Sequence, residues 1–327
     1  MPDFSVVICA YTLDRWNDLA EAVRAVWAQS LPPREVIVVI DHNPALLQRA
    51  GAELPATVMA NSEARGLSGA RNTGLRMAQG EVVAFMDEDA VPAPDWLARL
   101  NAGYSDPRVL GVGGAIEPLW AAGRPRWFPT EYDWVVGCTY LGMPTTPAPV
   151  RNLIGCNMSL RRELFGALGG FRDGIGRVGA HPVGCEETEL CIRAGQLWPG
   201  GVFLYEPSAR VQHRVPAQRG TWAYFRSRCF YEGRSKALVA ALAGRQAGLS
   251  TERTYALQTL PRGVAAGLWD TMRHGDVAGL GRAVAIGAGL LITAAGYLTG
   301  RTDARAAQRQ DRAAQTRHAD AAGADVH

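Results

Sequence analysis

An acidic triplet, Asp87, Glu88 and Asp89, directly follows an apolar run that begins at Val82. Asp and Glu are poor strand formers, so we expect the triplet at the carboxyl end of a strand. Ligands bind outside that end of the strands in an open α/β sheet. Two carboxylates at alternate positions can share a hard divalent cation, which prefers oxygen ligands and bridges phosphate oxygens. The alternative is a solvated acidic turn after an edge strand.

A second acidic segment places Glu186 and Glu187 at the start of a helical pattern. Adjacent carboxylates repel each other, and in a poorly solvated site this raises the pKa of one of them toward the range of a general base. The alternative is an acidic first helical turn that the helix dipole favours.

Strands and helices alternate through the first ninety residues, which positions these acids. Apolar runs predict strands at 4–10 and 35–40, a short one near 56–60, and one that ends in the acidic triplet. Amphipathic patterns predict helices around 19–27 and 68–79. This alternation predicts an α/β, doubly wound and mostly parallel sheet, whose strands are apolar because both faces are covered. Three strand ends, at 9–11, 41 and 87–89, then meet at one edge.

Two features at this edge could bind a nucleotide. Asp41 ends the second strand, where an acid can accept hydrogen bonds from a ribose or a base; the alternative is a cap for the turn that follows. The glycine-rich segment 65–74 carries Arg71 where a helix begins, a pattern that suits phosphate binding. It is neither a Walker loop nor a dinucleotide fingerprint, which counts against an ATPase or a dehydrogenase.

The ordered motifs of the chain resemble those of the family 2 glycosyltransferases. The resemblance covers about residues 4–215, and it is carried by SVVICAYT at 5–12, VIVVID at 36–41, GLSGARNTG at 66–74, FMDED at 85–89, GCNMSLRR at 155–162, GGF at 169–171, GCEETEL at 184–190 and His213. Each motif is loose by itself, whereas the ordered set is specific.

This resemblance implies a GT-A fold, a nucleotide-diphosphate sugar donor, a divalent metal (Mn²⁺ or Mg²⁺) and inversion at the anomeric carbon. The positions that match donor-binding residues are Ala10, Tyr11, Asp41, Arg71, Asp87 and Glu88. The positions that match metal ligands are Asp89, Asp87 and His213, with Asp89 expected in direct contact. For His213 a purely structural role is the alternative.

The resemblance also assigns the general base to the second acid of a Glu-Asp pair. That position is Glu187 here, one methylene longer than the usual Asp, so Glu186 remains an alternative base. Several aromatic residues lie between the two acidic segments, and we expect one or two of them to contact the acceptor and the rest to be core: Trp120, Trp127, Phe128, Tyr132, Trp134 and Tyr140.

The composition is that of a soluble enzyme: 327 residues, 47% hydrophobic and 20% charged. A net charge of +3 is too small to imply nucleic-acid binding. The six cysteines form no CxxC pair, which favours reduced thiols in a cytoplasmic protein, and the N-terminus shows no secretory signal pattern.

The C-terminal third has a different composition. We expect a catalytic domain at 1–220, a helical region at 221–300 and a flexible tail at 301–327. Residues 222–236 interleave aromatic and basic side chains, which suits an anionic membrane surface as well as nucleic acid. The uncharged run 283–300 is short for a membrane span, so interfacial attachment, insertion and a buried helix are all open.

The sequence therefore predicts a metal-dependent, inverting glycosyltransferase that acts on a saccharide or lipid-linked acceptor in glycan or polysaccharide biosynthesis. We expect it in the cytoplasm or peripherally at the inner face of the cell membrane. Two alternatives are a nucleotide-sugar-binding protein without transfer activity and a sugar-1-phosphate nucleotidyltransferase. The turn after the first strand lacks the glycine-rich loop that the latter needs. Donor sugar, acceptor linkage and oligomeric state are not determined by the sequence.

Overall fold

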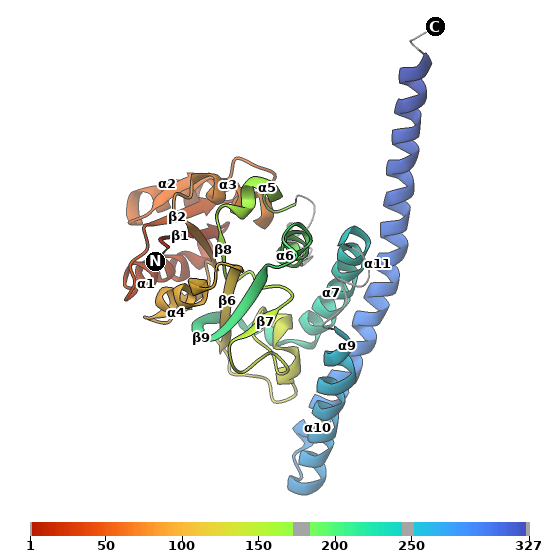
Figure 1. The fold of residues 1–327 in the computed structure, drawn as a ribbon. Helices are drawn as coiled ribbons and strands as arrows, with labels where there is room; N and C mark the ends of the chain where they lie inside the picture. Colours follow the sequence, from red (N-terminus) through yellow and green to blue (C-terminus); the bar gives the residue numbers. More distant parts are fainter. Residues whose placement is uncertain (1, 173–183, 244–251, 325–327) are drawn as a thin grey trace.

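The computed structural model describes residues 2–172, 184–243 and 252–324. They form an α/β body around one sheet, with a C-terminal group of long helices along one side of it (Figure 1). Within these residues the sheet has nine strands, in the order β3-β2-β1-β4-β8-β6-β9-β5, and β7 pairs with β9.

The N-terminal half of the sheet is parallel. Its strands are β1 (Phe4–Ala10), β2 (Glu35–Ile40), β3 (Thr57–Ala60) and β4 (Val82–Asp87). The first two have the predicted bounds. Most of their side chains are buried on both faces, and this explains why the sequence shows continuous apolar runs there. The predicted α/β architecture is therefore confirmed in this half.

Helices cover this parallel half: α1 (Trp16–Trp27), α2 (Pro44–Glu53) and α3 (Leu67–Met77). A Cβ at Gly74 would lie only 2.5 Å from Cγ1 of Val7, so a glycine is needed for α3 to approach the sheet. This close packing fixes α3, and with it Arg71, beside the strand ends.

Beyond β4 the sheet becomes mixed. Its other strands are β5 (Ala90–Pro92), β6 (Val109–Trp120), β7 (Ala148–Val150), β8 (Asn157–Arg161) and β9 (Val202–Val215). β8 runs antiparallel to both β4 and β6, whereas β9 is parallel to β6 and antiparallel to β5 and β7. The expectation of a mostly parallel sheet thus holds for the first half only.

Shorter elements connect these strands: η1 (Leu13–Arg15), α4 (Trp96–Ala102), η2 (Gly103–Ser105), η3 (Thr130–Val136), α5 (Leu164–Leu168), α6 (Glu186–Leu197) and η4 (Ala217–Gly220). Among the predicted aromatic residues, Phe128 is buried and its ring contacts Phe225 at 5.5 Å between centroids. It belongs to the core that joins the sheet to the C-terminal helices.

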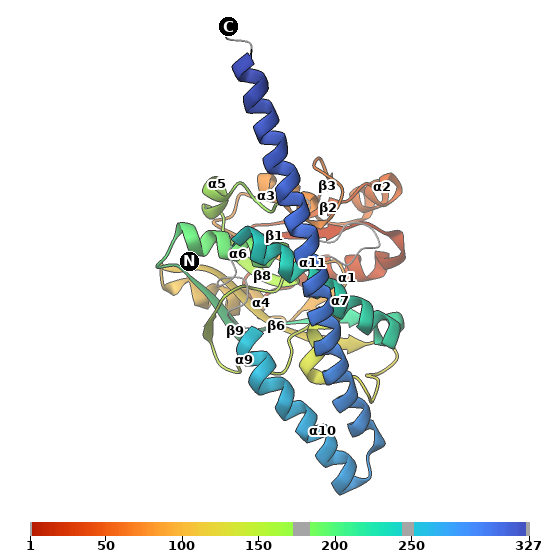
Figure 2. The ribbon, with the colours of Figure 1, turned by 90° about the vertical axis from the view of Figure 1, so that its right-hand side faces the viewer.

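The C-terminal elements are α7 (Trp222–Ala243), α9 (Glu252–Thr254), the π-helix η5 (Tyr255–Thr259), α10 (Leu260–His274) and α11 (Val277–Ala324). Helix α11 packs on α10 and on α7 and crosses in front of the sheet in Figure 2. Glycines at 233 and 296 allow the backbones of α7 and α11 to touch. The segment Val277–Thr302 of α11 is long and apolar enough to cross a membrane by length and composition, and 28% of its most apolar window is buried.

The tail predicted as flexible, 301–327, lies mostly within α11. Residues 302–324 continue α11 as a helix that projects beyond the body, and 325–327 lie outside the described residues (Figure 1). Ala, Arg and Gln dominate this stretch and are strong helix formers, so its lack of aromatic residues does not exclude a helix.

Candidate active site

A cavity of about 1170 Å³ opens beside the carboxyl ends of β1, β2 and β4. The register sets Cys9 opposite Asp87 and Ala10 opposite Ile40, so these ends meet at one edge. All ten residues predicted from the sequence line this cavity: Ala10, Tyr11, Asp41, Arg71, Asp87, Glu88, Asp89, Glu186, Glu187 and His213. The tertiary structure thus brings together candidates that are spread over two hundred residues.

The loop after β1 presents Tyr11 at the cavity. Its backbone N–H donates to Oε2 of Glu88 at 3.2 Å, and its carbonyl accepts from the amide of Asn43 at 3.0 Å. The ring is half-exposed, whereas Ala10 is buried. The fixed backbone and the open ring leave Tyr11 available to a flat ligand.

Asp41 ties the end of β2 to the loop before α3. Its Oδ1 accepts from Nδ2 of Asn61 at 2.7 Å, and its Oδ2 accepts from the N–H of Gly66 at 3.1 Å. Asn43, not Asp41, caps α2 by accepting from the N–H of Leu46 at 3.0 Å. Asn43 is therefore the N-cap of α2, whereas Oδ1 of Asp41 contacts the intervening turn at 2.8 Å from Nδ1 of His42.

The acidic triplet divides between different environments. Asp87 ends β4 and remains about a third exposed (35%) toward the cavity. Glu88 is buried and accepts from Arg15 at 3.1 Å as well as from Tyr11. Burial raises the pKa of Glu88 to about 8, although Arg15 opposes this shift. Glu88 thus holds the β1 loop in place more than it faces a ligand.

Asp89 is surrounded by a histidine and two arginines. The pairing of β5 with β9 sets Ala90 opposite His213, and the Nε2 atom of His213 lies 3.2 Å from Oδ1 of Asp89. Arg15 lies 3.1 Å and Arg219 3.8 Å from Oδ2. Burial alone would raise the pKa of Asp89, but His213 and the two guanidinium groups outweigh it and hold that pKa below its usual value. Asp89 is therefore a carboxylate at neutral pH.

The donor atoms here suit a divalent metal. Oxygen, nitrogen and sulfur atoms of Asp87, His213 and Cys156 lie within 4.8 Å of one another, and Asp89 contacts the same histidine. Carboxylates and imidazole are ligands for Mn²⁺-type ions. Burial raises the pKa of the Cys156 thiol well above its usual value, which keeps it protonated and a poor ligand. The two aspartates and His213 thus fit the predicted metal, with Asp87 presented more openly than Asp89.

Arg71 links the two acidic segments. Its buried guanidinium donates to Oε1 of Glu186 at 2.7 Å and lies 3.6 Å from Oδ1 of Asp87. A Cβ at Gly155 would lie 2.5 Å from Nη2 of Arg71, so only glycine leaves the arginine this space. The arginine predicted near a base or diphosphate therefore fixes α6 against the tip of β4.

The first turn of α6 contains three glutamates with different partners. Glu186 pairs with Arg71, and Glu189 pairs with Arg193 at 2.8 Å. Within the described part of the chain, Glu187 forms no ion pair, and it lines the cavity. Its burial, and then the charge of Glu186, raise the pKa of Glu187 to about 8 against the opposing effect of Arg71. Glu187 thus differs from Glu186 and Glu189, each of which pairs with an arginine.

Past these acids the cavity extends toward the C-terminal helices. Of the aromatic residues expected near an acceptor, the ones that line it are Tyr132, Trp134 and Tyr140. Helices α7 and α11 and the π-helix η5 close this end. The site therefore includes parts of the helical region that the sequence suggested as separate from the catalytic domain.

Sequence reasoning missed several charged residues of the site: Arg15, Arg219, Arg228, Glu232 and Lys236. Arg15 lies four residues after Tyr11, in a polar turn that carries no distinctive pattern. The last three recur at intervals of four along α7 and hence share one helix face, a signal that could have been found.

Comparisons with known proteins agree with this geometry. A family model described as "Glycosyl transferase family 2" matches residues 5–169. The chain is 34% identical to the glucosyl-dolichyl phosphate glucuronosyltransferase of Haloferax volcanii, over 73% of this chain and 77% of that protein. It is 28% identical to the succinoglycan biosynthesis protein ExoM of Rhizobium meliloti, over 72% of this chain and 74% of that protein.

A solved structure shares the fold. The mannosyltransferase PcManGT from Pyrobaculum calidifontis, in complex with GDP-Man and Mn²⁺, superposes with a TM-score of 0.58 at 22% identity. The match covers 92% of this chain and 86% of that one, and so includes the C-terminal helices as well as the sheet.

Proposed function

This chain belongs to glycosyl transferase family 2, and we propose that it transfers a sugar from a nucleotide-diphosphate sugar to a saccharide or lipid-linked acceptor. The predicted enzyme class, a glycosyltransferase of the hexosyltransferase type, and the predicted GT-A fold are confirmed. A role in glycan or polysaccharide biosynthesis agrees with the relatives.

The donor binds, in this proposal, where the strand ends meet. The half-exposed ring of Tyr11 offers a surface for the base, and the N-terminus of α3 lies beside the same cavity. The structural neighbour solved with GDP-Man supports a nucleotide sugar as the donor.

The metal site consists of Asp87, Asp89 and His213. A divalent ion bound there would neutralise the charge that develops on the diphosphate leaving group. The ion pairs of Asp89 with Arg15 and His213 keep that carboxylate charged before any ion arrives. The Mn²⁺ of the structural neighbour supports this assignment.

Glu187 is the general base, and its lack of an ion-pair partner is the observation that carries the assignment. Glu187 takes the proton of the acceptor hydroxyl while that oxygen bonds to the anomeric carbon, and the bond from this carbon to the diphosphate breaks on the opposite face. The configuration therefore inverts. Glu186 is less suited because its carboxylate already pairs with the buried guanidinium of Arg71 at 2.7 Å.

Membrane association is part of the proposal. Exposed apolar side chains line α10 and the apolar part of α11, and one relative is named for a dolichyl phosphate substrate. Attachment along the surface would satisfy those side chains without insertion of the helix.

A thermal-shift panel tests the donor site. UDP, GDP, TDP and their sugars are each added with and without Mn²⁺, and we expect one nucleotide to raise the melting temperature in a metal-dependent manner. A matched panel with Asp87→Asn should lose the metal dependence. If no nucleotide shifts the wild-type protein, the proposed donor site is wrong.

A further inference from the structure

We propose that the C-terminal end of the cavity binds the hydrocarbon chain of a phosphate-linked lipid acceptor. The proposal rests on the transfer reaction proposed above, and it assigns the acceptor class and the place where its chain lies. The lining of the cavity, its size and the surface onto which it opens lead to this inference.

Next to the proposed catalytic acids, the cavity is lined by a charged face of α7. Glu232 lies 3.7 Å from Arg228 and 3.4 Å from Lys236, and all three side chains are largely buried at the cavity. This face contacts the start of α6, because Sγ of Cys185 lies 3.8 Å from Glu232. Guanidinium and ammonium groups bind phosphate oxygens, so Arg228 and Lys236 in the cavity lining suit a phosphate close to the reacting sugar.

Beyond this face the lining becomes apolar. The apolar residues come from α7, the loop after η3, α10 and α11: Val239, Met143, Pro144, Leu260, Leu290, Ala294 and Leu298. At about 1170 Å³ the cavity exceeds the roughly 300–1,000 Å³ of usual small-molecule sites, so one end can hold a nucleotide sugar while the other remains open. A π-helix, η5, forms part of this wall; such segments frequently occur at functional sites.

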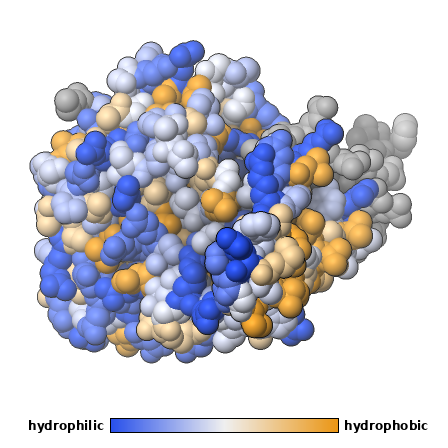
Figure 3. Space-filling view, turned by 90° about the horizontal axis from the view of Figure 1, so that it is seen from below, coloured by the Kyte–Doolittle hydropathy of each residue, from blue (hydrophilic) through white to orange (hydrophobic). Residues whose placement is uncertain are grey.

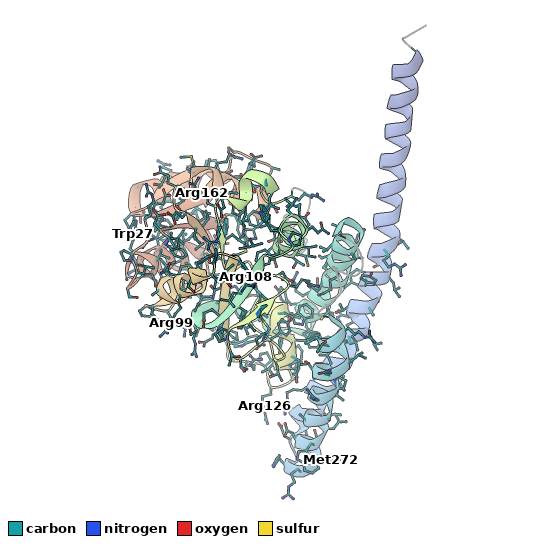
Figure 4. The ribbon with its side chains drawn as sticks, viewed as in Figure 1. Trp27, Arg99, Arg108, Arg126, Arg162 and Met272 are labelled. Atoms are coloured by element: carbon teal, nitrogen blue, oxygen red, sulfur yellow. The ribbon has the colours of Figure 1, made fainter. Side chains whose placement is uncertain are left out.

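The apolar end adjoins an outer surface that is also apolar. Leu257, Leu268 and Met272 recur on one face of the η5–α10 segment, and Val284, Leu291 and Leu298 recur every seven residues along α11. All are between 59% and 75% exposed, apart from Leu268 at 41%. Leu298 belongs to both the cavity wall and this outer stripe. Figure 3 shows hydrophobic residues on the side formed by these helices. Helices α10 and α11 form a helical hairpin, and Met272 lies at its tip in Figure 4.

Charges beside this surface favour an anionic bilayer as its occupant. Residues 253–301 contain two acids, Asp270 and Asp276, and both contact Arg282, at 2.7 and 3.4 Å. Arg262 and Arg273 are exposed beside the apolar face of α10. A basic, aromatic-bearing amphipathic helix of this kind lies in the headgroup region of a membrane. A lipid acceptor could thus pass from the bilayer past Leu298 into the cavity while its phosphate meets Arg228 and Lys236.

Photo-crosslinking tests this assignment in the full-length protein. The probe is a C15 prenyl phosphate with a terminal diazirine, and the labelled peptides are mapped by mass spectrometry. We expect labels within 254–260 and 290–298. Ala294→Phe, which fills the cavity wall, should reduce this labelling at least fivefold, whereas Ala295→Phe, the adjacent residue outside the lining, should not. Leu290→Trp and Leu291→Trp form a second pair with the same contrast, in case one variant does not fold.

Competition with unlabelled lipids tests whether the phosphate of the lipid contributes to binding. Unlabelled farnesyl phosphate should displace the probe at least tenfold better than farnesol; equal competition would overturn the phosphate assignment. Labelling that is equal in both members of each pair, or confined to 261–284, would mean adsorption to the outer surface and would overturn the cavity site. The shifts of the melting temperature that nucleotides cause are measured on the same protein, to separate the lipid site from the proposed donor site. If those shifts persist while the cavity is not labelled, the lipid site is refuted and the proposed donor site is not.

Discussion

The two ends of the cavity are built on opposite physical principles. At the donor end, buried polar and charged groups lie at rigid strand ends and satisfy one another: Asp89 with Arg15 and His213, and Glu186 with Arg71. At the other end, helices present apolar side chains to the cavity and to the outside.

This contrast indicates which part of the site is complete by itself. Buried charges without partners are costly, so the donor end must satisfy its ion pairs within the chain. A large exposed apolar surface marks an interaction site. The donor end is thus preorganised, whereas in our proposal the helical end gains its full environment from a membrane. The following predictions test this difference, beginning with the largest effect.

Asp89→Ala should have the largest effect, because it leaves His213, Arg15 and Arg219 without their shared carboxylate. We expect loss of metal-dependent nucleotide binding and a destabilisation of about 3–5 kcal/mol, typical of a broken buried ion pair. Calorimetric titration and chemical denaturation measure the two effects. Asp106→Ala is the control, since this exposed acid pairs with the neighbouring Arg108. Unchanged nucleotide binding would remove Asp89 from the metal site.

Glu187→Gln should reduce turnover by about 10²–10⁴-fold, the usual contribution of a general base. Nucleotide binding should persist, because Arg71 and Glu186 retain their ion pair. Glu187→Asp, which restores the length usual in the family, should retain more activity than the glutamine variant. Near-normal turnover of Glu187→Gln would assign the proton transfer to another group.

Met272→Glu tests the helical end. This residue is 75% exposed at the tip of the hairpin. Burial of such a side chain contributes about 1.5–3 kcal/mol, so the substitution should weaken binding to phosphatidylglycerol-containing vesicles by about tenfold or more. Met77→Glu is the matched control, at a methionine 47% exposed on the body. Equal sedimentation of both variants with the vesicles would contradict a membrane-facing hairpin.

The pH dependence should show the smallest effect. Folding raises the pKa of Glu187 from 4.5 to about 8, so the folded protein binds the proton more tightly. This stabilisation is fully present below pH 4.5 and is lost as the pH rises through 8. Glu187→Gln should therefore raise the melting temperature by a few degrees at pH 8.5 but not at pH 4, while wild-type turnover rises toward pH 8. If the melting temperatures of the two proteins differ by the same amount at pH 4 and at pH 8.5, this account is refuted.

The sequence by itself determined the parallel half of the fold and the location of the acids. Strands β1 and β2 have the predicted bounds because their residues are apolar on both faces, and β4 ends at Asp87 because acids do not continue a buried strand. The start of α6 was readable from its acidic first turn. These are local properties, so a short segment contains them.

Only the tertiary structure decided what each acid does. Asp87, Glu88 and Asp89 look alike in the sequence, but strands β4 and β5 direct them to different partners. Arg71 reaches Glu186 across 115 residues, and that contact distinguishes Glu186 from its neighbour Glu187. Likewise, composition left the environment of 283–300 open, and packing against α7 and α10 showed which side of α11 is covered. Such contacts join distant segments, so no local pattern encodes them.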